Sequence, residues 1–347
     1  MWTAQMINLL QRSMMRTLVT ASLACATAIG TVLGVPSAAS ARTEITVYVN
    51  PSGAATASAA GAGLAADRAV RTLADAVRVL KARGAGASKA TMVLAPGVYS
   101  GSIDPGAELP ATSLAVKCKN ATLDGKGASG YAITLRTSKS SVEGCKIKNY
   151  THGGVLASGS GALSGIVVKK TTFSDLGTKR KKNRGRNGYG AVHLKNVRSA
   201  KVTGNTFLRL ENSQRYRKRR PDGQWEIIDK YGNMHGVYFA VGSSGSKRAY
   251  NIVKDNTFHT ISGDPIRMSD GSSYVYASGN SFRNAGSNGM VTYWWFSRDR
   301  RCAKHNYAYR NSGRSGYKRP GGSSKTIPHV KSASGCSGSV KDGPAPR

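Results

Sequence analysis

The chain has 347 residues, with 51 lysines and arginines against 17 aspartates and glutamates, and a formal net charge of +34. This length suits one large domain or two ordinary ones. The 41 glycines and the low aromatic content of 7% argue against a helical bundle. The charge favours polyanionic partners that bind in a salt-dependent way, but it does not specify any chemistry. A basic protein without a charged target is the alternative.

The first 41 residues have the pattern of a secretory signal peptide. Arg12 and Arg16 precede an apolar, alanine-rich run, and small residues follow up to Ala41. This pattern predicts cleavage after Ala41 and a secreted, extracellular protein, and it argues against a membrane anchor. Removal of the two arginines lowers the formal charge from +34 to +32.

The cysteines predict disulfides. Cys25 lies in the predicted signal peptide, so Cys118, Cys145, Cys302 and Cys336 remain. An even number in an exported protein favours disulfide pairing, with three possible connectivities. We expect the local pairs Cys118–Cys145 and Cys302–Cys336. No two of these cysteines are close in sequence, so we do not expect a zinc site.

A short amphipathic segment precedes a region of repeated phrases. DRAVRTLADAVRVLKARG predicts a helix near residues 67–82 that caps the fold. Beyond it, one phrase recurs: VEGCKI at 142, VKKTTF at 168, VTGNTF at 202, VKDNTF at 253 and ASGNSF at 277. A repeat in the twenties, lengthened by insertions, indicates a stacked β-solenoid. We expect Asn205, Asn256 and Asn280 to hydrogen-bond from one rung to the next, and the phenylalanines to stack inside.

A second phrase alternates with the first. It occurs as GGVLA at 153, GAVHLK at 190, HGVYFA at 235, DPIRMS at 264 and NGMVTYW at 288, and each copy predicts a further strand. The predicted fold is therefore all-β: a right-handed parallel β-helix with an N-terminal capping α-helix. We expect a single domain over residues 42–336 and a disordered tail over 337–347.

Several of these segments resemble a known group of proteins. YVNPSG at 48, the DRAVRTLADAV helix and TMVLAPGVYSG at 91 are similar to the opening of secreted bacterial β-helix proteins of the pectate-lyase-like superfamily. HGVYFA, ISGDPIRMSDGS and the Asn-x-Phe turns extend the resemblance over roughly residues 45–315. It implies the β-helix fold. It does not choose a substrate, because that superfamily includes lyases, glycoside hydrolases, epimerases, esterases and non-catalytic adhesins.

Alignment of the second phrase predicts a row of polar side chains. The residues expected to point inward are Val155, Val192, Val237, Ile266 and Val291. The next residues, including His193, Tyr238 and Arg267, should then point outward on successive rungs about 4.8 Å apart. We call these three residues the central row, and we expect it at the surface. A polar ladder that only solvates the sheet is the competing interpretation.

Other polar residues are expected beside the central row. His235 and Asp264 precede their strands by matching offsets, and Lys195 and Trp294 extend the same face. The candidate catalytic residues are Arg267, Tyr238, His193, His235 and Lys195. Asp264 and Trp294 are candidate substrate-binding residues.

Two basic insertions, residues 178–189 and 213–233, lead into strands that carry His193 and Tyr238. We expect them to overhang the central row and to form the walls of a cleft that binds a polyanion. Their candidate substrate-binding residues are Lys179, Arg180, Arg217 and Arg219.

This arrangement favours cleavage of a uronic-acid polysaccharide by β-elimination. Arg267, with Lys195, suits neutralisation of the substrate carboxylate. Tyr238, His193 or His235 suits the acid and base. The resemblance also implies that an arginine or lysine can be the base, so the assignment stays open. Asp264 and Asp270 alone would make a weak calcium site. We expect no cofactor, with calcium left as an option.

Two other functions compete with this one. A glycoside hydrolase needs a pair of carboxylates, for which Asp264 with Asp270, Asp229 or Glu226 is available. A non-catalytic module would only hold an anionic polymer at the cell surface. We expect no sequence-specific nucleic-acid binding, no membrane anchor, and a monomer.

Overall fold

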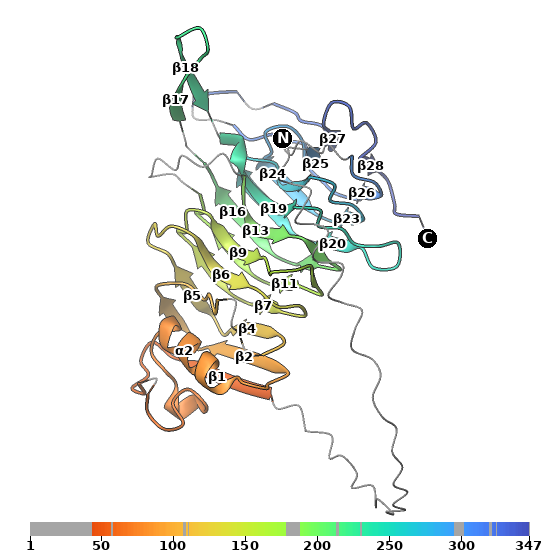
Figure 1. The fold of residues 1–347 in the computed structure, drawn as a ribbon. Helices are drawn as coiled ribbons and strands as arrows, with labels where there is room; N and C mark the ends of the chain where they lie inside the picture. The colour runs from red at the N-terminus through yellow and green to blue at the C-terminus, as the bar shows by residue number, and fades with distance from the viewer. Residues whose placement is uncertain are drawn as a thin grey trace, which may run out of the picture. The chain divides into compact units, whose positions relative to one another are not determined.

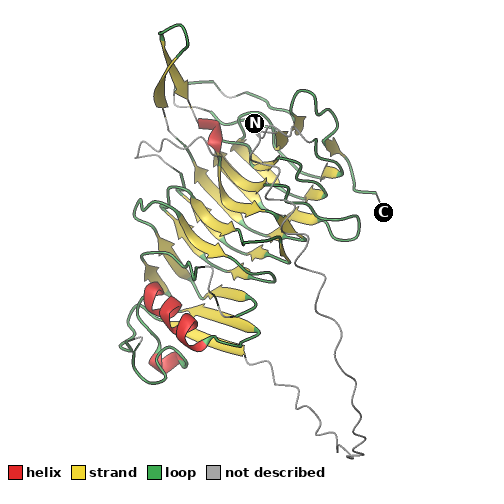
Figure 2. Ribbon diagram, in the orientation of Figure 1, coloured by secondary structure: helices red, strands yellow, loops and turns green. Residues whose placement is uncertain are grey.

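The computed structural model describes residues 44–56, 58–106, 109, 111–177, 188–212, 215–229, 231–294, 302–318, 321–323 and 325–346. The predicted signal peptide and residues 178–187 of the first insertion lie outside this range. Among the described residues, short strands dominate and helix is confined to brief segments (Figure 2). The helices are η1 (Ala66–Arg68), α2 (Leu73–Arg83) and η2 (Tyr231–Asn233).

Within the described residues, the chain winds through three long parallel sheets, and successive strands of each sheet stack in chain order (Figure 1). Sheet A consists of β1 (Glu44–Val49), β2 (Lys89–Leu94), β4 (Leu114–Cys118), β7 (Ser141–Glu143), β11 (Val167–Lys169), β15 (Lys201–Thr203), β20 (Asn251–Lys254), β23 (Val275–Ser278), β26 (Asn306–Tyr309) and β28 (Val340–Asp342). Sheet B consists of β3 (Gly97–Tyr99), β5 (Ala121–Asp124), β8 (Lys146–Lys148), β12 (Thr172–Ser174), β16 (Thr206–Leu210), β21 (Thr257–Ile261) and β24 (Ser281–Ala285). Sheet C consists of β6 (Tyr131–Leu135), β9 (Gly153–Ala157), β13 (Tyr189–Lys195), β19 (Met234–Ala240), β22 (Ile266–Ser269), β25 (Val291–Trp294) and β27 (Val330–Ser332).

This winding confirms the predicted right-handed parallel β-helix. Two small sheets accompany it: β10 (Leu163–Ser164) pairs in parallel with β14 (Val197–Arg198), and β17 (Arg215–Arg219) pairs antiparallel with β18 (Trp225–Asp229). The helix α2 overlaps the helix predicted near residues 67–82, but it begins six residues later and ends one residue later. Thr72 begins it by accepting a hydrogen bond from the backbone N–H of Asp75 at 3.0 Å, and Leu80 on its inner side is fully buried. Its role as a cap of the β-helix stays a prediction.

Packing of side chains in the core explains features of both repeated phrases. Phe173, Phe207, Phe258 and Phe282 stack in one line, with ring centroids 4.5–5.2 Å apart. In two copies of the second phrase, glycine precedes the inward valine where the sheet C backbone passes against these rings. A Cβ on Gly154 or on Gly236 would lie only 2.4 Å from a ring atom of Phe173 or Phe258.

The predicted asparagine ladder is present at the turn between sheets A and B. The side-chain Nδ2 of Asn205 donates to Oδ1 of Asn256 at 3.0 Å, and Asn256 donates to Asn280 at 2.9 Å. Asn280 donates in turn to Asn311 at 2.8 Å. The preceding residue lies in the left-handed region, as at Gly279 with φ 64°. That conformation accounts for the recurring Gly-Asn pair, because glycine adopts it without steric cost.

We expect Asn256→Ala to lower the free energy of unfolding by about 1–3 kcal/mol, because the buried backbone N–H of Asn205 loses the Oδ1 that accepts it at 2.9 Å. Chemical denaturation checks this. The neighbouring exposed change Thr257→Ala should have little effect, and an unchanged denaturation midpoint in Asn256→Ala would count against the ladder as a source of stability.

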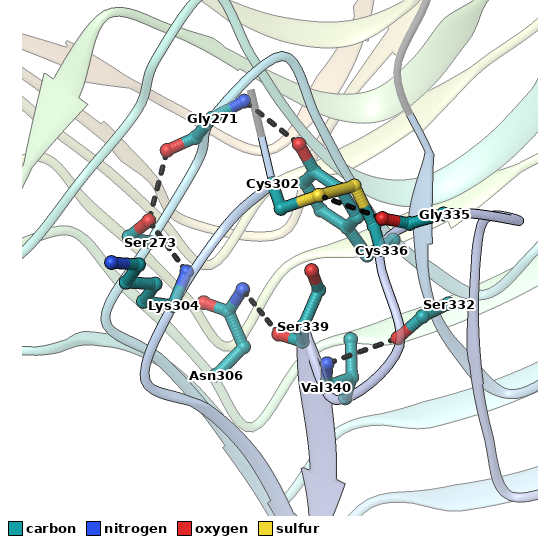
Figure 3. The surroundings of a disulfide bond; sticks show 11 residues. Gly271, Ser273, Cys302, Lys304, Asn306, Ser332, Gly335, Cys336, Ser339 and Val340 are labelled. Atoms are coloured by element: carbon teal, nitrogen blue, oxygen red, sulfur yellow. Dashed lines mark hydrogen bonds between the residues drawn. A yellow bond between two sulfur atoms is a disulfide. The ribbon is translucent and has the colours of Figure 1, made fainter. Parts of the chain in front are cut away.

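Both predicted disulfides, Cys118–Cys145 and Cys302–Cys336, are formed. The second joins segments 34 residues apart near the C-terminus (Figure 3). Beside it, the side chain of Asn306 donates to the backbone oxygens of Ser272 and Ser339 at 3.1 and 3.0 Å, and so bridges separate rungs.

The predicted disorder of residues 337–347 is wrong for part of that tail. Strand β28 pairs in parallel with β26, and Val340 is buried. The disulfide and the Asn306 hydrogen bonds hold the chain at this point, so a segment that is polar in sequence still adds a strand to sheet A.

We expect the double variant Cys302→Ser with Cys336→Ser to lower the free energy of unfolding by about 2–4 kcal/mol, because loss of the cross-link raises the conformational entropy of the unfolded chain. Equilibrium unfolding of the variant and the parent measures this. In excess reductant the difference should disappear; a difference that persists would mean that the cross-link is not its cause.

Candidate active site

Sheet C brings the central row together in the predicted register. His193 pairs with Tyr238, and Tyr238 pairs with Arg267, on the adjacent strands β13, β19 and β22. The inward residues beside them, such as Val192 and Val237, are fully buried in the core. The imidazole of His193 stacks on the ring of Tyr238 with centroids 4.6 Å apart.

The central row is covered, which corrects the prediction that it stands at the surface. The exposed fractions are 4% for His193 and 6% each for Tyr238 and Arg267. The chain entering β13 is one part of the cover, since a Cβ on Gly188 would lie 3.3 Å from atoms of both His235 and Tyr238. Strand alternation shows which side of a sheet a residue occupies, but it does not show what packs against that side.

Arg267 forms a buried ion pair with Asp264, whose carboxylate is fully enclosed. One Arg267 nitrogen donates to Oδ2 of Asp264 at 3.1 Å, and the Thr292 hydroxyl donates to the same oxygen at 2.9 Å. Oδ1 accepts from the Ser287 hydroxyl and from the backbone and side-chain nitrogens of Asn288 at 2.9–3.3 Å. Burial alone would raise the pKa of Asp264, but Arg267 and the other donors hold it below its usual range. Asp264 is therefore a buried anion whose two oxygens accept hydrogen bonds from within the protein, and its role in substrate binding stays a prediction.

His235 meets Asp264, as its sequence offset predicted. The backbone N–H of Asp264 donates to Nδ1 of His235 at 3.0 Å, and the backbone oxygen of Asp264 lies 3.2 Å from the same nitrogen. Burial and then the nearby Arg267 charge lower the pKa of His235 to about 3. His235 is accordingly neutral and held by the backbone, which suits a supporting role better than that of a base.

His193 combines burial with an unused nitrogen. Its Nδ1 lies 2.6 Å from the hydroxyl of Tyr131, while its Nε2 is buried and has no hydrogen-bond partner among the described residues. Burial, and then the charge of Lys195, lower the pKa of His193 well below the ordinary histidine value. Burial raises the pKa of both Tyr131 and Tyr238. The imidazole and both phenols are therefore neutral near pH 7.

Tyr131 was missed in the sequence. It lies on β6, whose YAITL segment is a further copy of the second phrase, one rung before the first copy that was recognised. Extending the alignment by one rung would have added its strand to sheet C.

Lys195 and Trp294 lie at the borders of this group and are only partly buried. The Trp294 ring lies 5.4 Å from the guanidinium carbon of Arg267 and 6.0 Å from the ammonium of Lys331. This contact adds to the cover over Arg267. Lys195 is on β13 two residues beyond His193, and its pairing partner on β19 is Ala240.

The basic insertions are described only in part. Lys179 and Arg180 lie outside the described residues, and so does the side chain of Arg217. The second insertion contains the β17–β18 hairpin, in which exposed Arg219 donates to the backbone oxygen of Gly223 at 3.3 Å and Arg220 pairs with Glu226 at 3.5 Å. That these insertions overhang the central row stays a prediction.

Neither a metal centre nor a membrane span is found in the described part of the chain. It contains no group of three or more histidine, cysteine, aspartate or glutamate residues arranged to hold a metal ion. None of its helices has both the length and the hydropathy needed to cross a bilayer.

Comparison with known proteins supports the fold seen here. A family model described as a right-handed beta helix region matches residues 111–312, which is more than half of the chain. Comparisons with curated proteins and with solved structures give no match. The matched region contains the whole central row together with His235 and Asp264. The chain belongs to the right-handed β-helix family.

Proposed function

We propose that this protein is a secreted lyase that cleaves a uronic-acid polysaccharide by β-elimination at sheet C. The observation that carries the proposal is the buried Nε2 of His193, left without a described partner beside the protonated hydroxyl of Tyr238. The two disulfides, the signal-like N-terminal sequence and the resemblance to pectate-lyase-like proteins support secretion and a polysaccharide substrate.

In the proposed reaction, His193 is the base and Tyr238 is the acid. Nε2 of His193 removes the C5 proton of the uronate. The lowered pKa keeps the imidazole neutral, and in the tautomer with its proton on Nδ1, facing Tyr131, the lone pair on Nε2 accepts the proton. The C5–H electrons form the C4–C5 double bond, the C4–O4 bond breaks, and the Tyr238 hydroxyl gives its proton to O4. Solvent then returns a proton to Tyr238 and removes the one on His193. Tyr131 positions the imidazole through Nδ1.

The substrate carboxylate needs a cation that is not already committed. Arg267 is neutralised by Asp264 at 3.1 Å, whereas Lys195 is only partly buried and acts electrostatically on His193. Lys195 therefore suits this task better than Arg267. Because the reacting groups are covered, the polymer reaches them only when the residues packed over sheet C move aside.

The observations do not favour the other catalytic function. A hydrolytic carboxylate must bind a proton or attack the sugar, but both oxygens of Asp264 are already occupied by donors and its pKa is lowered. A non-catalytic polyanion-binding protein is the second candidate, and the burial of the central row is the observation in its favour.

The test is incubation of the protein with alginate, polygalacturonate, glucuronan and hyaluronan. A lyase should produce the ultraviolet absorbance of an unsaturated uronide from at least one polymer. New reducing ends without that absorbance would indicate hydrolysis and would refute the proposal. Salt-sensitive binding with no product would support the non-catalytic alternative instead.

A further inference from the structure

A second group of aromatic side chains gathers on sheet A. Tyr276 on β23 pairs in register with Tyr307 on β26. The ring of Tyr250, just before β20, lies edge-on to those of Tyr274, Tyr276 and Tyr307 at 5.7–6.4 Å. Tyr274 stacks on His305 at 4.6 Å. We call these five residues the tyrosine surface.

These rings are not needed to fill the interior. None of them belongs to the hydrophobic core formed by the inward-facing residues. Tyr250, Tyr274 and Tyr276 are partly exposed and His305 is exposed, while Tyr307 lies at the base of the group. Tyr274 and His305 also have positive φ angles of 56° and 60°, a conformation that is uncommon for bulky residues. The turns thus hold two large rings outward at some conformational cost.

Cations border the tyrosine surface. Strand pairing places Lys201, Ile252, Tyr276, Tyr307 and Lys341 in one row across five successive strands. Both lysines are exposed.

Three further exposed cations, Lys247, Arg248 and Lys304, are close in sequence to Tyr250 and His305. Two exposed carboxylates are already paired: Asp255 lies 3.6 Å from the ammonium of Lys254, and Asp342, next to Lys341, lies 3.0 Å from Nδ1 of His329. The border of the tyrosine surface is therefore positively charged.

We propose that the tyrosine surface binds one strand of an anionic polysaccharide, laid across the strands of sheet A. Sugar rings pack against the tyrosine rings, and Lys201 and Lys341 pair with carboxylates at either end. The spacing of the rungs, about 4.8 Å, is comparable to the length of one monosaccharide, so successive sugars meet successive rungs. The class of ligand rests on the proposed function, whereas the surface is separate from sheet C and does not depend on the chemistry there.

The test measures binding of fluorescently labelled polygalacturonate and alginate to the full chain at fixed salt. We expect Tyr250→Ala with Tyr276→Ala to weaken the affinity for the polymer that binds by roughly tenfold, equivalent to about 1.4 kcal/mol. Tyr48→Ala, a partly exposed tyrosine on β1 of the same sheet, is the matched control and should bind like the parent.

A second double variant tests the cations at the border of the tyrosine surface. Lys201→Gln with Lys341→Gln should weaken binding and flatten its dependence on salt, whereas Lys117→Gln, an exposed lysine on β4, should do so less. The double tyrosine variant and the double lysine variant should each unfold at the same denaturant concentration as the parent. Weaker binding then does not come from a folding defect.

The outcomes separate this inference from the proposed function. If the tyrosine variant binds polymer like the parent, the inference is wrong, whether or not unsaturated product forms. If the parent forms no product but tyrosine-dependent binding remains, the inference stands and the proposed lyase does not. Equal tyrosine-dependent binding of dextran, or of single-stranded DNA, would overturn the assignment to an anionic glycan.

Discussion

His193→Ala should reduce the formation of unsaturated uronide by about 10²–10⁴-fold, the usual contribution of a positioned acid or base. The reason is the loss of the buried Nε2, which is the nitrogen that takes the C5 proton. Tyr238→Phe should cause a loss of similar size, because it removes the hydroxyl that protonates O4. Initial rates on the polymer identified as substrate measure both effects.

The pH dependence provides a separate check on His193. Because burial lowers its pKa, the base stays unprotonated below the ordinary histidine value of 6.5, and the rate should fall only at pH values under 6.5. His259→Ala, a histidine on sheet B outside the site, is the matched control and should keep the parent rate. Full activity in His193→Ala would remove this residue from the mechanism.

Asp264→Asn should lower the free energy of unfolding by about 3–5 kcal/mol, because it removes the carboxylate charge that lies 3.1 Å from the buried guanidinium of Arg267. The side chains of this pair are 7% and 0% exposed. Urea denaturation measures the loss. Adding Arg267→Met should recover much of it, because the buried positive charge is then gone as well.

An exposed ion pair is the control for Asp264. Arg209 and Asp175 form two charge-assisted hydrogen bonds of 2.7 Å, but their side chains are 50% and 36% exposed. Asp175→Asn should therefore cost no more than about 1 kcal/mol. Equal losses at both positions would mean that burial does not decide the contribution of Asp264.

Much of the fold was predictable because each rung repeats the same local requirements. The two phrases predicted the pairing of Val192 with Val237 and of Val237 with Ile266, the asparagine ladder and the phenylalanine stack. Both disulfides were predicted by pairing each cysteine with its nearest neighbour along the mature chain. In a solenoid each rung contacts mainly its neighbours, so short-range patterns carry most of the architecture.

Strand register predicted which residues of the site are neighbours, but not what covers them. Register correctly placed Tyr238 between His193 and Arg267 and brought His235 to Asp264. It did not reveal that these residues are covered, because register does not specify what packs on the outer side of a sheet. There the chain at Gly188 lies against His235 and Tyr238, and the Trp294 ring lies against Arg267. The same limit explains why Asp264 appeared available for substrate while its oxygens accept hydrogen bonds from a later loop.

Strand β28 also affects how molecules of this protein meet one another. On its far side β26 would present unpaired backbone amides and carbonyls to solvent, and such a row is a template onto which a second chain can add a strand. Residues 340–342 occupy that position with a short strand whose Lys341 and Asp342 are exposed charges. A short strand with two exposed charges is a poor template for pairing with a second copy of the chain along this edge of sheet A.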